Sequence, residues 1–242
     1  MNLPPGEYYC RNSLNLYDAP ACEVLATQAK TGRHLQVLSS SSNPINAIKV
    51  RLCEDNYLAW LPLNQVNLLV KVDRVYQAIA FSRSEIEQLL PEVINFTLTA
   101  MKQPNYYLWG GTIGPNYDCS GLIQAAFANS GIWLPRDSYE QAEFTLTITK
   151  EQLVPGDLIF FGKPKINHVA LYLGNNQYIH SSGKEKGRNG IAIEQLSLDG
   201  DEVSQSYYRQ LAQFGRVMSS LYSIPKSIVI RQGARIPLSL RH

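Results

Sequence analysis

The stretch YLWGGTIGPNYDCSGLIQAAFANSG, residues 107–131, decides how the second half of the chain folds. A loop rich in glycine leads into Asp118, a residue type favoured at helix N-caps. The residues that follow place apolar side chains on one helical face, at Leu122, Ile123, Ala126 and Phe127. Gly131 then supplies a helix stop. The sequence therefore predicts a helix whose first turn carries Cys119.

A cysteine at this position can be a reactive thiol. A thiol attacks as its thiolate, and the dipole at a helix N-terminus or a nearby protonated imidazole lowers the thiol pKa. The first condition is predicted from the sequence, whereas the second requires a histidine that the fold brings close. A lone cysteine at a helix start is also typical of a small buried hydrophobic residue.

A hairpin further along the chain supplies two histidines. The runs HVALYLG and QYIHSSG are typical of two strands that flank Gly174, Asn175 and Asn176. With a three-residue loop, His180 would lie opposite Ala170, diagonal to His168 and within side-chain reach. A single histidine on a strand is usually a polar residue with an ordinary partner. Together with Cys119, however, the pair predicts a nucleophile, its base and an orienting group.

The first 70 residues have a different character. Six short β-prone runs alternate with turn residues about every ten positions, which is typical of a small β-barrel: GEYYCRN, LNLYD, CEVLATQ, HLQVLSS, AIKVRLC and YLAWLPL. Residues 83–103 then show helical spacing of apolar side chains, with Ser82 or Ser84 as the cap and Pro91 dividing or kinking the helix. The order of elements predicts an α+β unit behind a β domain, with the boundary near residue 75. The β-like run SIVIRQ in the tail has no predicted place.

Composition excludes several classes of function. The chain has 242 residues, 45% of them apolar, and a formal net charge of +2. That balance indicates neither nucleic acid nor an anionic membrane as a partner. The four cysteines form no CxxC pair, so neither a disulfide framework nor a structural zinc site is expected. With neither a signal-peptide pattern nor a long apolar run, a cytoplasmic location is expected.

Several motifs together resemble the NlpC family of papain-like cell-wall endopeptidases. They are YLWGG (107–111), DCSG (118–121), LPRDSYEQ (134–141), PGDLIFF (155–161), HVALYLG (168–174) and YIHSSG (178–183). They follow the family's order and spacing over roughly residues 84–218. The segment NYLAWLPLNQVNLL resembles the end of a bacterial SH3-like domain. The resemblance implies an SH3-like β-barrel over residues 1–75 and a papain-like α+β catalytic domain over residues 76–242.

The same resemblance implies a reaction and its residues. Cys119 would be the nucleophile, His168 the base, His180 the orienting residue and Tyr107 a donor on the oxyanion side, with no metal or other cofactor. The implied reaction is hydrolysis of the bond between γ-linked D-Glu and the following diamino acid, diaminopimelate or Lys, in peptidoglycan stem peptides.

Relatives with such an N-terminal module act on free murein peptides that begin with L-Ala, and the module overhangs the cleft. The substrate amine then needs an acceptor, for which motif position indicates Asp118, assisted by Ser120 and Tyr57. A helix cap is the alternative role for Asp118, and a core aromatic for Tyr57. Arg136 is a candidate for binding the diamino acid's carboxylate, or a brace for a loop. The implied setting is recycling of murein fragments inside a bacterial cell.

Three other interpretations remain open at this point. The chain could be an inactive protein that binds peptidoglycan peptides, although a decayed site would be expected to lose Cys119 or His168. It could be a thiol acyltransferase on the same scaffold. A metal site built from Cys119, His168 and His180 is the third, although no fourth ligand is evident.

Overall fold

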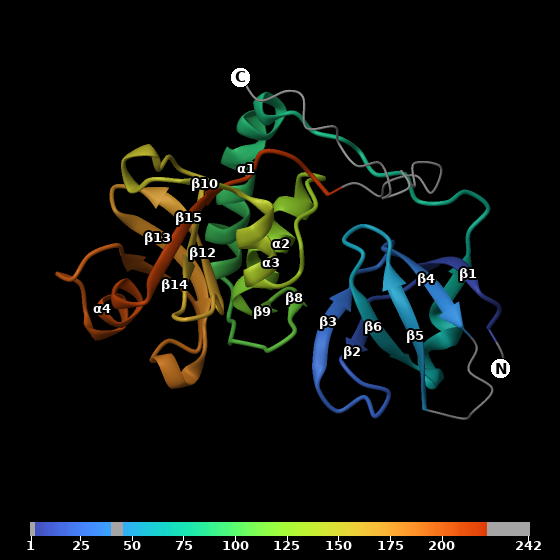
Figure 1. Cartoon of the computed structure of the whole chain (residues 1–242). Helices are drawn as coiled ribbons and strands as arrows, with labels where there is room; N and C mark the ends of the chain where they lie inside the picture. The colour runs from blue at the N-terminus through green and yellow to red at the C-terminus, as the bar shows by residue number, and fades with distance from the viewer. Residues whose placement is uncertain (1–2, 40–45, 222–242) are drawn as a thin grey trace, which may run out of the picture.

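The computed structural model describes residues 3–39 and 46–221, in which an all-β domain and an α+β domain lie side by side (Figure 1). The tail run SIVIRQ falls outside these residues. Within the described segments, no helix combines the length and the apolar character needed to cross a membrane. The predicted boundary near residue 75 falls between the last strand of the first domain and the first α-helix.

Seven antiparallel strands form the N-terminal domain, in the sheet order β3-β2-β6-β5-β4-β1-β7. They are β1 Gly6–Cys10, β2 Leu14–Tyr17, β3 Leu25–Ala29, β4 His34–Ser39, β5 Ala47–Leu52, β6 Leu58–Pro62 and β7 Leu69–Lys71, with a 3-10 helix at Leu63–Leu68. Alternate side chains, such as Leu14 and Leu16, are buried in the interior. Each predicted β run overlaps one of β1–β6, and the predicted SH3-like barrel is confirmed.

The first helix, α1 Arg83–Met101, follows a linker after β7. Ser82 caps it, because the Ser82 side chain accepts from the Glu85 amide and Glu85 reaches back to the cap. Of the two predicted effects of Pro91, division of the helix is wrong, since Pro91 lies inside one 19-residue helix, while a kink stays a prediction. Proline removes one helical amide donor, and burial of Ile86 and Val93 against the core stabilises the continuous helix.

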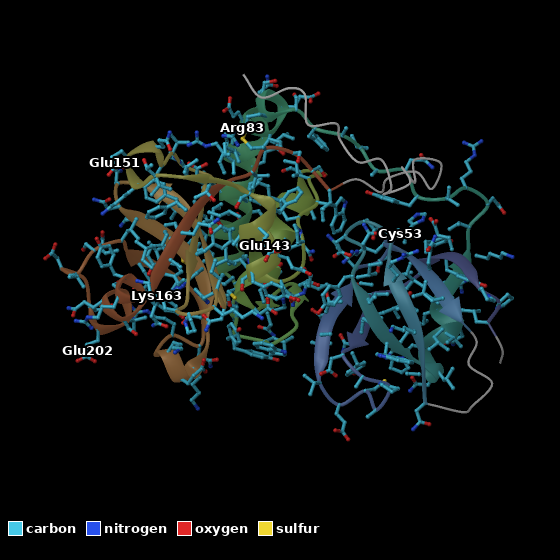
Figure 2. The ribbon with its side chains drawn as sticks, viewed as in Figure 1. Cys53, Arg83, Glu143, Glu151, Lys163 and Glu202 are labelled. Carbon is cyan, nitrogen blue, oxygen red and sulfur yellow. The ribbon has the colours of Figure 1, made fainter. Side chains whose placement is uncertain are left out.

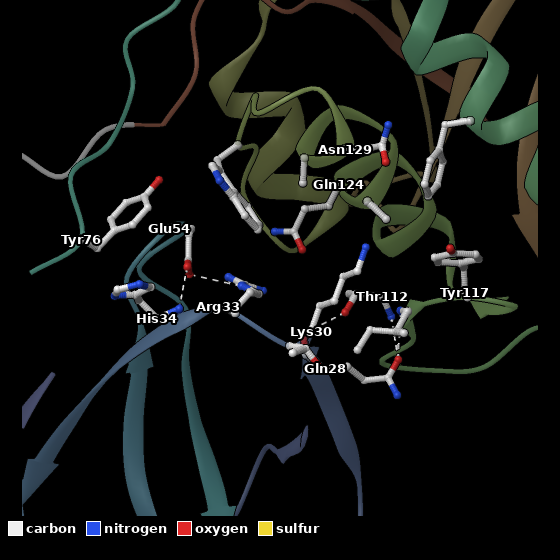
Figure 3. Close-up of a pocket in the computed structure, with 18 residues that line it drawn as sticks. Gln28, Lys30, Arg33, His34, Glu54, Tyr76, Thr112, Tyr117, Gln124 and Asn129 are labelled. Atoms are coloured by element: carbon white, nitrogen blue, oxygen red, sulfur yellow. Dashed lines mark hydrogen bonds and ion pairs between the residues drawn. The ribbon is translucent and has the colours of Figure 1, made fainter. Parts of the chain in front are cut away.

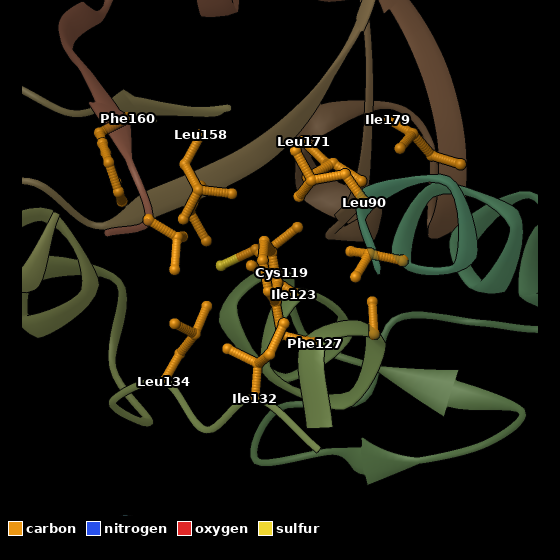
Figure 4. Close-up of a cluster of buried hydrophobic side chains, with 14 of the residues drawn as sticks. Leu90, Cys119, Ile123, Phe127, Ile132, Leu134, Leu158, Phe160, Leu171 and Ile179 are labelled. Carbon is orange, nitrogen blue, oxygen red and sulfur yellow. The ribbon is translucent and has the colours of Figure 1, made fainter. Parts of the chain in front are cut away.

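The second domain is built on a six-stranded sheet, in the order β10-β15-β11-β12-β13-β14. Its elements are β8 Thr112–Ile113, β9 Asn116–Tyr117, α2 Cys119–Asn129, α3 Ser138–Phe144, β10 Leu146–Ile148, β11 Leu158–Phe161, β12 His168–Gly174, β13 Gln177–Ser182, β14 Gly190–Gln195, α4 Glu202–Arg209 and β15 Leu211–Arg216, with 3-10 turns at Lys150–Gln152 and Lys184–Lys186. Helices α1 and α2 share one apolar cluster with the sheet, shown in Figure 4. Tyr207 of α4 belongs to a second cluster on the sheet. The predicted α+β architecture of this domain is confirmed.

The β12–β13 hairpin has the predicted register but a shorter turn than predicted. Its turn is the two-residue Asn175-Asn176, with φ of 52° and 56°, as in a type I′ turn. A bulge near the end of β12 takes up the residue that the predicted three-residue loop would have held. Leu171 therefore pairs with Ile179, and the same register continued by one residue puts His180 opposite Ala170.

Hydrogen bonds join the barrel to the nucleophile helix and to the loop before it. The side chain of Gln28 on β3 accepts from the amides of Thr112 and Ile113, at 3.0 and 3.1 Å. The side chain of Gln124 on α2 donates to Asp55 of the barrel at 2.9 Å, and this contact is buried. The barrel is thus tied directly to the helix that begins with Cys119.

Candidate active site

The nucleophile predicted from the sequence is the first residue of α2. Asp118 is its N-cap and accepts a hydrogen bond from the Gly121 amide at 2.6 Å. Close packing fixes this turn, since a Cβ on Gly121 would lie 2.0 Å from the Gly111 carbonyl oxygen. Gly110 has φ +77° and packs against the barrel, where a Cβ would lie 2.5 Å from the Leu25 carbonyl oxygen. Glycines therefore let the loop pass between the barrel and the helix.

Burial decides the charge of the Cys119 thiol. The residue is 6% exposed, and Figure 4 shows it among the side chains of the apolar cluster. Burial, with a contribution from the charge of Asp118, raises the pKa of Cys119 to about 12, although the backbone amides of Val169 and Ser120 act in the opposite direction. The predicted lowering of this pKa is therefore reversed in the folded site, because desolvation outweighs the helix N-terminus.

The two predicted histidines are in direct contact. His168 Nε2 lies 2.8 Å from His180 Nδ1, and their rings meet edge to face at 86°. Because Nε2 of His168 is engaged with His180, any proton exchange between His168 and the Cys119 thiol would have to use the other ring nitrogen, Nδ1. The Val169 amide that faces Cys119 follows His168 directly in the chain, so the sulfur lies at the start of the histidine strand.

Aromatic side chains enclose the histidine pair. The Tyr207 ring lies 4.6 Å from that of His168 and 4.8 Å from that of His180, and Phe161 lies 5.8 Å from His168. Burial lowers the pKa of both imidazoles, that of His168 well below its usual value. The resting site therefore holds a protonated thiol and neutral imidazoles.

This electrostatic arrangement predicts a protonated Cys119 at neutral pH. The ultraviolet absorbance of thiolate, taken as wild type minus Cys119→Ala, should be absent at pH 7 and should appear only on the alkaline side of the ordinary thiol pKa of about 8.5. Alkylation of Cys119 by iodoacetamide should accelerate over the same alkaline range. A full thiolate signal at pH 7 would contradict this and show that an ion pair with His168 outweighs burial.

A cavity of about 580 Å³ opens beside Cys119, between the two domains. The site residues Tyr57, Tyr107, Asp118, Ser120 and Arg136 line it together with Cys119, as do Asp18, Val24, Leu25 and Ala26 of the barrel. His168 and His180 do not line it and lie deeper in the domain. The barrel therefore forms one wall of the cleft that the nucleophile faces.

Asp118 and Arg136 form a buried pair beneath this cleft. Asp118 accepts from the amides of Gly110 and Gly121 and from both terminal nitrogens of Arg136. Arg136 is 2% exposed and also donates to Thr27 of the barrel at 3.1 Å. With these four donors and the Ser120 hydroxyl on its two oxygens, Asp118 has the geometry of a cap. Arg136 likewise has the geometry of a brace.

Ser120 takes part in the same network, accepting from Arg136 at 2.9 Å and donating to Asp118 at 3.3 Å. Tyr107 and Tyr57 stand on opposite walls of the cleft, one from the loop before α2 and one from the barrel. Burial raises the pKa of both phenols, so each hydroxyl keeps its proton and can donate.

Sequence reasoning missed Asp137, which lies next to Arg136 and lines the cleft. It stands at the N-cap of α3 but makes no capping hydrogen bond, and no ion pair to it is found in the described segments. Burial raises the pKa of this carboxyl, and Arg136 opposes that shift. The sequence signal that could have identified Asp137 is its position in the motif LPRDSYEQ, directly before the helix α3.

A second cavity, of about 550 Å³, lies farther along the domain contact (Figure 3). Lys30, Arg33 and Tyr76 line its barrel side, and Gln124 and Trp133 its other side. None of the catalytic residues predicted from the sequence lines it. No disulfide links the four cysteines, which all lie within the described residues, and Cys53 lies in the barrel (Figure 2). Of the four, Cys119 lines the first cavity.

Comparison with known families identifies both domains. The NlpC/P60 family profile matches residues 104–212, and the profile of the bacterial dipeptidyl-peptidase SH3 domain matches residues 16–66. A gamma-D-glutamyl-L-lysine dipeptidyl-peptidase of Bacillus cereus is 43% identical over 84 residues, 33% of this chain and 25% of that protein. A probable endopeptidase NlpC homolog of Haemophilus influenzae is 46% identical over 91 residues, 37% of this chain and 46% of that protein. The chain thus matches less than half the length of these relatives.

Among solved structures, an NlpC/P60 family protein of Bacillus cereus aligns with a TM-score of 0.47 at 24% identity, over 88% of this chain and 64% of that one. The peptidoglycan hydrolase RipB of Mycobacterium tuberculosis aligns with a TM-score of 0.47 at 26% identity, over 57% of this chain and 69% of that one. The profiles thus show that the chain contains an NlpC/P60 family domain, preceded by a bacterial dipeptidyl-peptidase SH3 domain.

Proposed function

We propose that the chain is a cysteine endopeptidase that cleaves free murein stem peptides between γ-D-Glu and the diamino acid. The observation that carries this proposal is the placement of Cys119 on a cleft walled by the barrel, with the His168–His180 pair at the strand beside it. Two relatives, from Bacillus cereus and Bacillus subtilis, carry the name gamma-D-glutamyl-L-lysine dipeptidyl-peptidase, which supports this substrate class.

The chemistry follows from the protonation states. Nδ1 of His168 takes the thiol proton as sulfur attacks the γ-D-glutamyl carbonyl carbon, and the oxyanion accepts from the Cys119 amide and the Tyr107 hydroxyl. His168 then protonates the departing amine of the diamino acid as the C–N bond breaks. Water, deprotonated by His168, releases the peptide acid from sulfur. His180 holds the His168 ring throughout.

The barrel supplies the selectivity for short peptides. Its residues Asp18, Leu25 and Tyr57 close one side of the cleft, and a peptide with a free N-terminal L-Ala ends there. The ammonium of that L-Ala requires an acceptor. Asp118 already accepts from five donors. Asp137 forms no ion pair within the described residues and accepts from the Tyr139 hydroxyl at 3.3 Å, so we assign the ammonium to Asp137 with the Tyr57 hydroxyl beside it. Lys165, which also lines the cleft, is the cation available to the diamino acid's carboxylate.

Such selectivity predicts a place in murein recycling in a bacterial cytoplasm. An acylated or longer peptide would leave the carboxylate unpaired, which costs binding free energy. Defined substrates test this: the free tripeptide L-Ala-γ-D-Glu-diaminopimelate, its N-acetyl form, the lysine analogue and intact sacculi, with mass spectrometry locating the bond that is cut. Equal activity on sacculi and on free tripeptide would refute the recycling role, and a cut elsewhere would refute the bond assignment.

Asp137→Asn is expected to lower kcat/KM for the free tripeptide about 10- to 100-fold, because one charge-assisted hydrogen bond to the ammonium is lost. The poor cleavage of the N-acetyl peptide should change little. Glu143→Gln is the matched control, since it removes one negative charge from the same helix at an exposed position that does not line the cleft. Equal losses of kcat/KM on the free and the N-acetyl peptide would show that Asp137 does not bind the substrate ammonium.

A further inference from the structure

The histidine pair ends in a nitrogen that faces a buried carboxylate. His180 is fully buried, and its Nδ1 forms the hydrogen bond with His168. The other ring nitrogen, Nε2, therefore needs a partner inside the protein. Among the described residues, no group lies within hydrogen-bond distance of this Nε2. The Oε1 oxygen of Glu194, however, lies 3.8 Å away.

Strand pairing aims Glu194 at this nitrogen. On β13 and β14, His180 pairs with Ala192 and Tyr178 pairs with Glu194. Glu194 is therefore diagonal to His180 on the same face of the sheet, one pair farther along. The side chain is 3% exposed, which excludes water as its main partner.

A second layer of contacts holds Glu194 in place and ionised. Arg188 forms a two-pronged ion pair with it, and Arg188 Nη2 lies 2.9 Å from Oε2. The Ser204 hydroxyl donates to the same oxygen. Burial alone would raise the pKa of Glu194, but the hydrogen bonds from Arg188 and Ser204, together with the nearby His180 ring, lower it to about 2. Asp201, which is exposed, pairs with the same Nη2 atom of Arg188.

We propose that Glu194 is a positioning residue that fixes the proton arrangement of the catalytic histidine pair, an inference that rests on the proposed peptidase function. A carboxylate only accepts, so the nitrogen of His180 that faces it must carry a proton. Neutral His180 then presents a lone pair on Nδ1 and accepts the Nε2 proton of His168. This leaves the lone pair of His168 on Nδ1, where the thiol proton must go.

The opposite arrangement would stop the reaction. If His180 carried its proton on Nδ1, it would donate to His168 Nε2, and the His168 proton would sit on Nδ1. No lone pair would then face Cys119. The carboxylate also favours the imidazolium that forms when His168 takes the thiol proton, because its negative charge lies behind His180.

The tautomer can be measured without a substrate. In protein carrying ¹⁵N-labelled histidine, NMR should find His180 protonated on Nε2 in the wild type. In Glu194→Gln, whose amide can donate as well as accept, a second population protonated on Nδ1 should appear. Asp201→Asn is the matched control, because it loosens the same arginine without touching His180, and its spectrum should match the wild type. A wild-type His180 protonated on Nδ1 overturns the proposal, even if the Gln variant fails to fold.

Kinetics on the free tripeptide separate positioning from packing. Glu194→Gln should lower kcat about 10- to 100-fold, since the base is mispositioned rather than removed, with KM unchanged. In a His180→Asn background, which has no ring tautomer, the same change should alter kcat less than twofold. Equal losses in both backgrounds, or a folded Glu194→Gln with wild-type kcat, would overturn the role. If the wild type cleaves no murein peptide, the proposed function fails, while the NMR result still decides the tautomer.

Discussion

Cys119→Ala is expected to lower kcat/KM for the free tripeptide by about 10⁴-fold or more. The variant keeps the helix and the cleft but has no atom that can form the acyl-enzyme, and loss of a nucleophile typically has an effect of this size. Stability should change little, because alanine leaves only the small volume of the sulfur at a 6% exposed site. Peptide cleavage and urea denaturation of the same preparation measure both quantities.

Cys22→Ser provides the matched control, since Cys22 is a partly exposed barrel cysteine that does not line the cleft. It should retain wild-type activity and wild-type inactivation by iodoacetamide. Mass spectrometry of the alkylated wild type should place the inactivating label on Cys119. Activity above about 1% in Cys119→Ala would mean that another group performs the chemistry.

Local signals explain what the sequence could predict. Asp118 as a cap and Gly131 as a stop specify α2 within a dozen residues, and the Asn175-Asn176 pair specifies a tight turn. Strand alternation then limits the partners of His168 to residues on the same face of β13. A bulge and a shorter turn compensate each other in the hairpin, so the predicted register was reached although the predicted loop was not.

Burial and long-range charge pairing explain what the sequence could not predict. The direction of the Cys119 pKa depends on how much apolar surface covers it, which is a property of the packed domain. The sequence predicts for Arg136 either binding of the diamino acid's carboxylate or bracing of a loop, and it does not show that Thr27 of the barrel and Asp118 are its partners. Glu194 lies in no recognisable motif. Its proximity to His180 could not be predicted, because it depends on the pairing of β13 with β14.

Arg136→Met is expected to lower the free energy of unfolding by about 3–5 kcal/mol. Methionine fills much of the arginine volume but leaves Asp118, 5% exposed, without a counter-charge, and breaking a buried ion pair from one side has a cost of this size. Glu87→Gln is the comparison, since Glu87 is exposed and pairs with Arg83, and such surface pairs contribute about 0–1 kcal/mol. Urea denaturation followed by tryptophan fluorescence measures both variants.

A second change tests the cause of the loss. If the uncompensated charge is responsible, Asp118→Asn added to Arg136→Met should recover part of the stability, because asparagine still caps α2 without a negative charge. If lost packing or the lost bond to Thr27 is responsible, the double variant should be no more stable than Arg136→Met alone. Because Asp118 raises the Cys119 pKa, the same Asn change should also move the thiolate absorbance toward lower pH, which connects the buried pair to the nucleophile beside it.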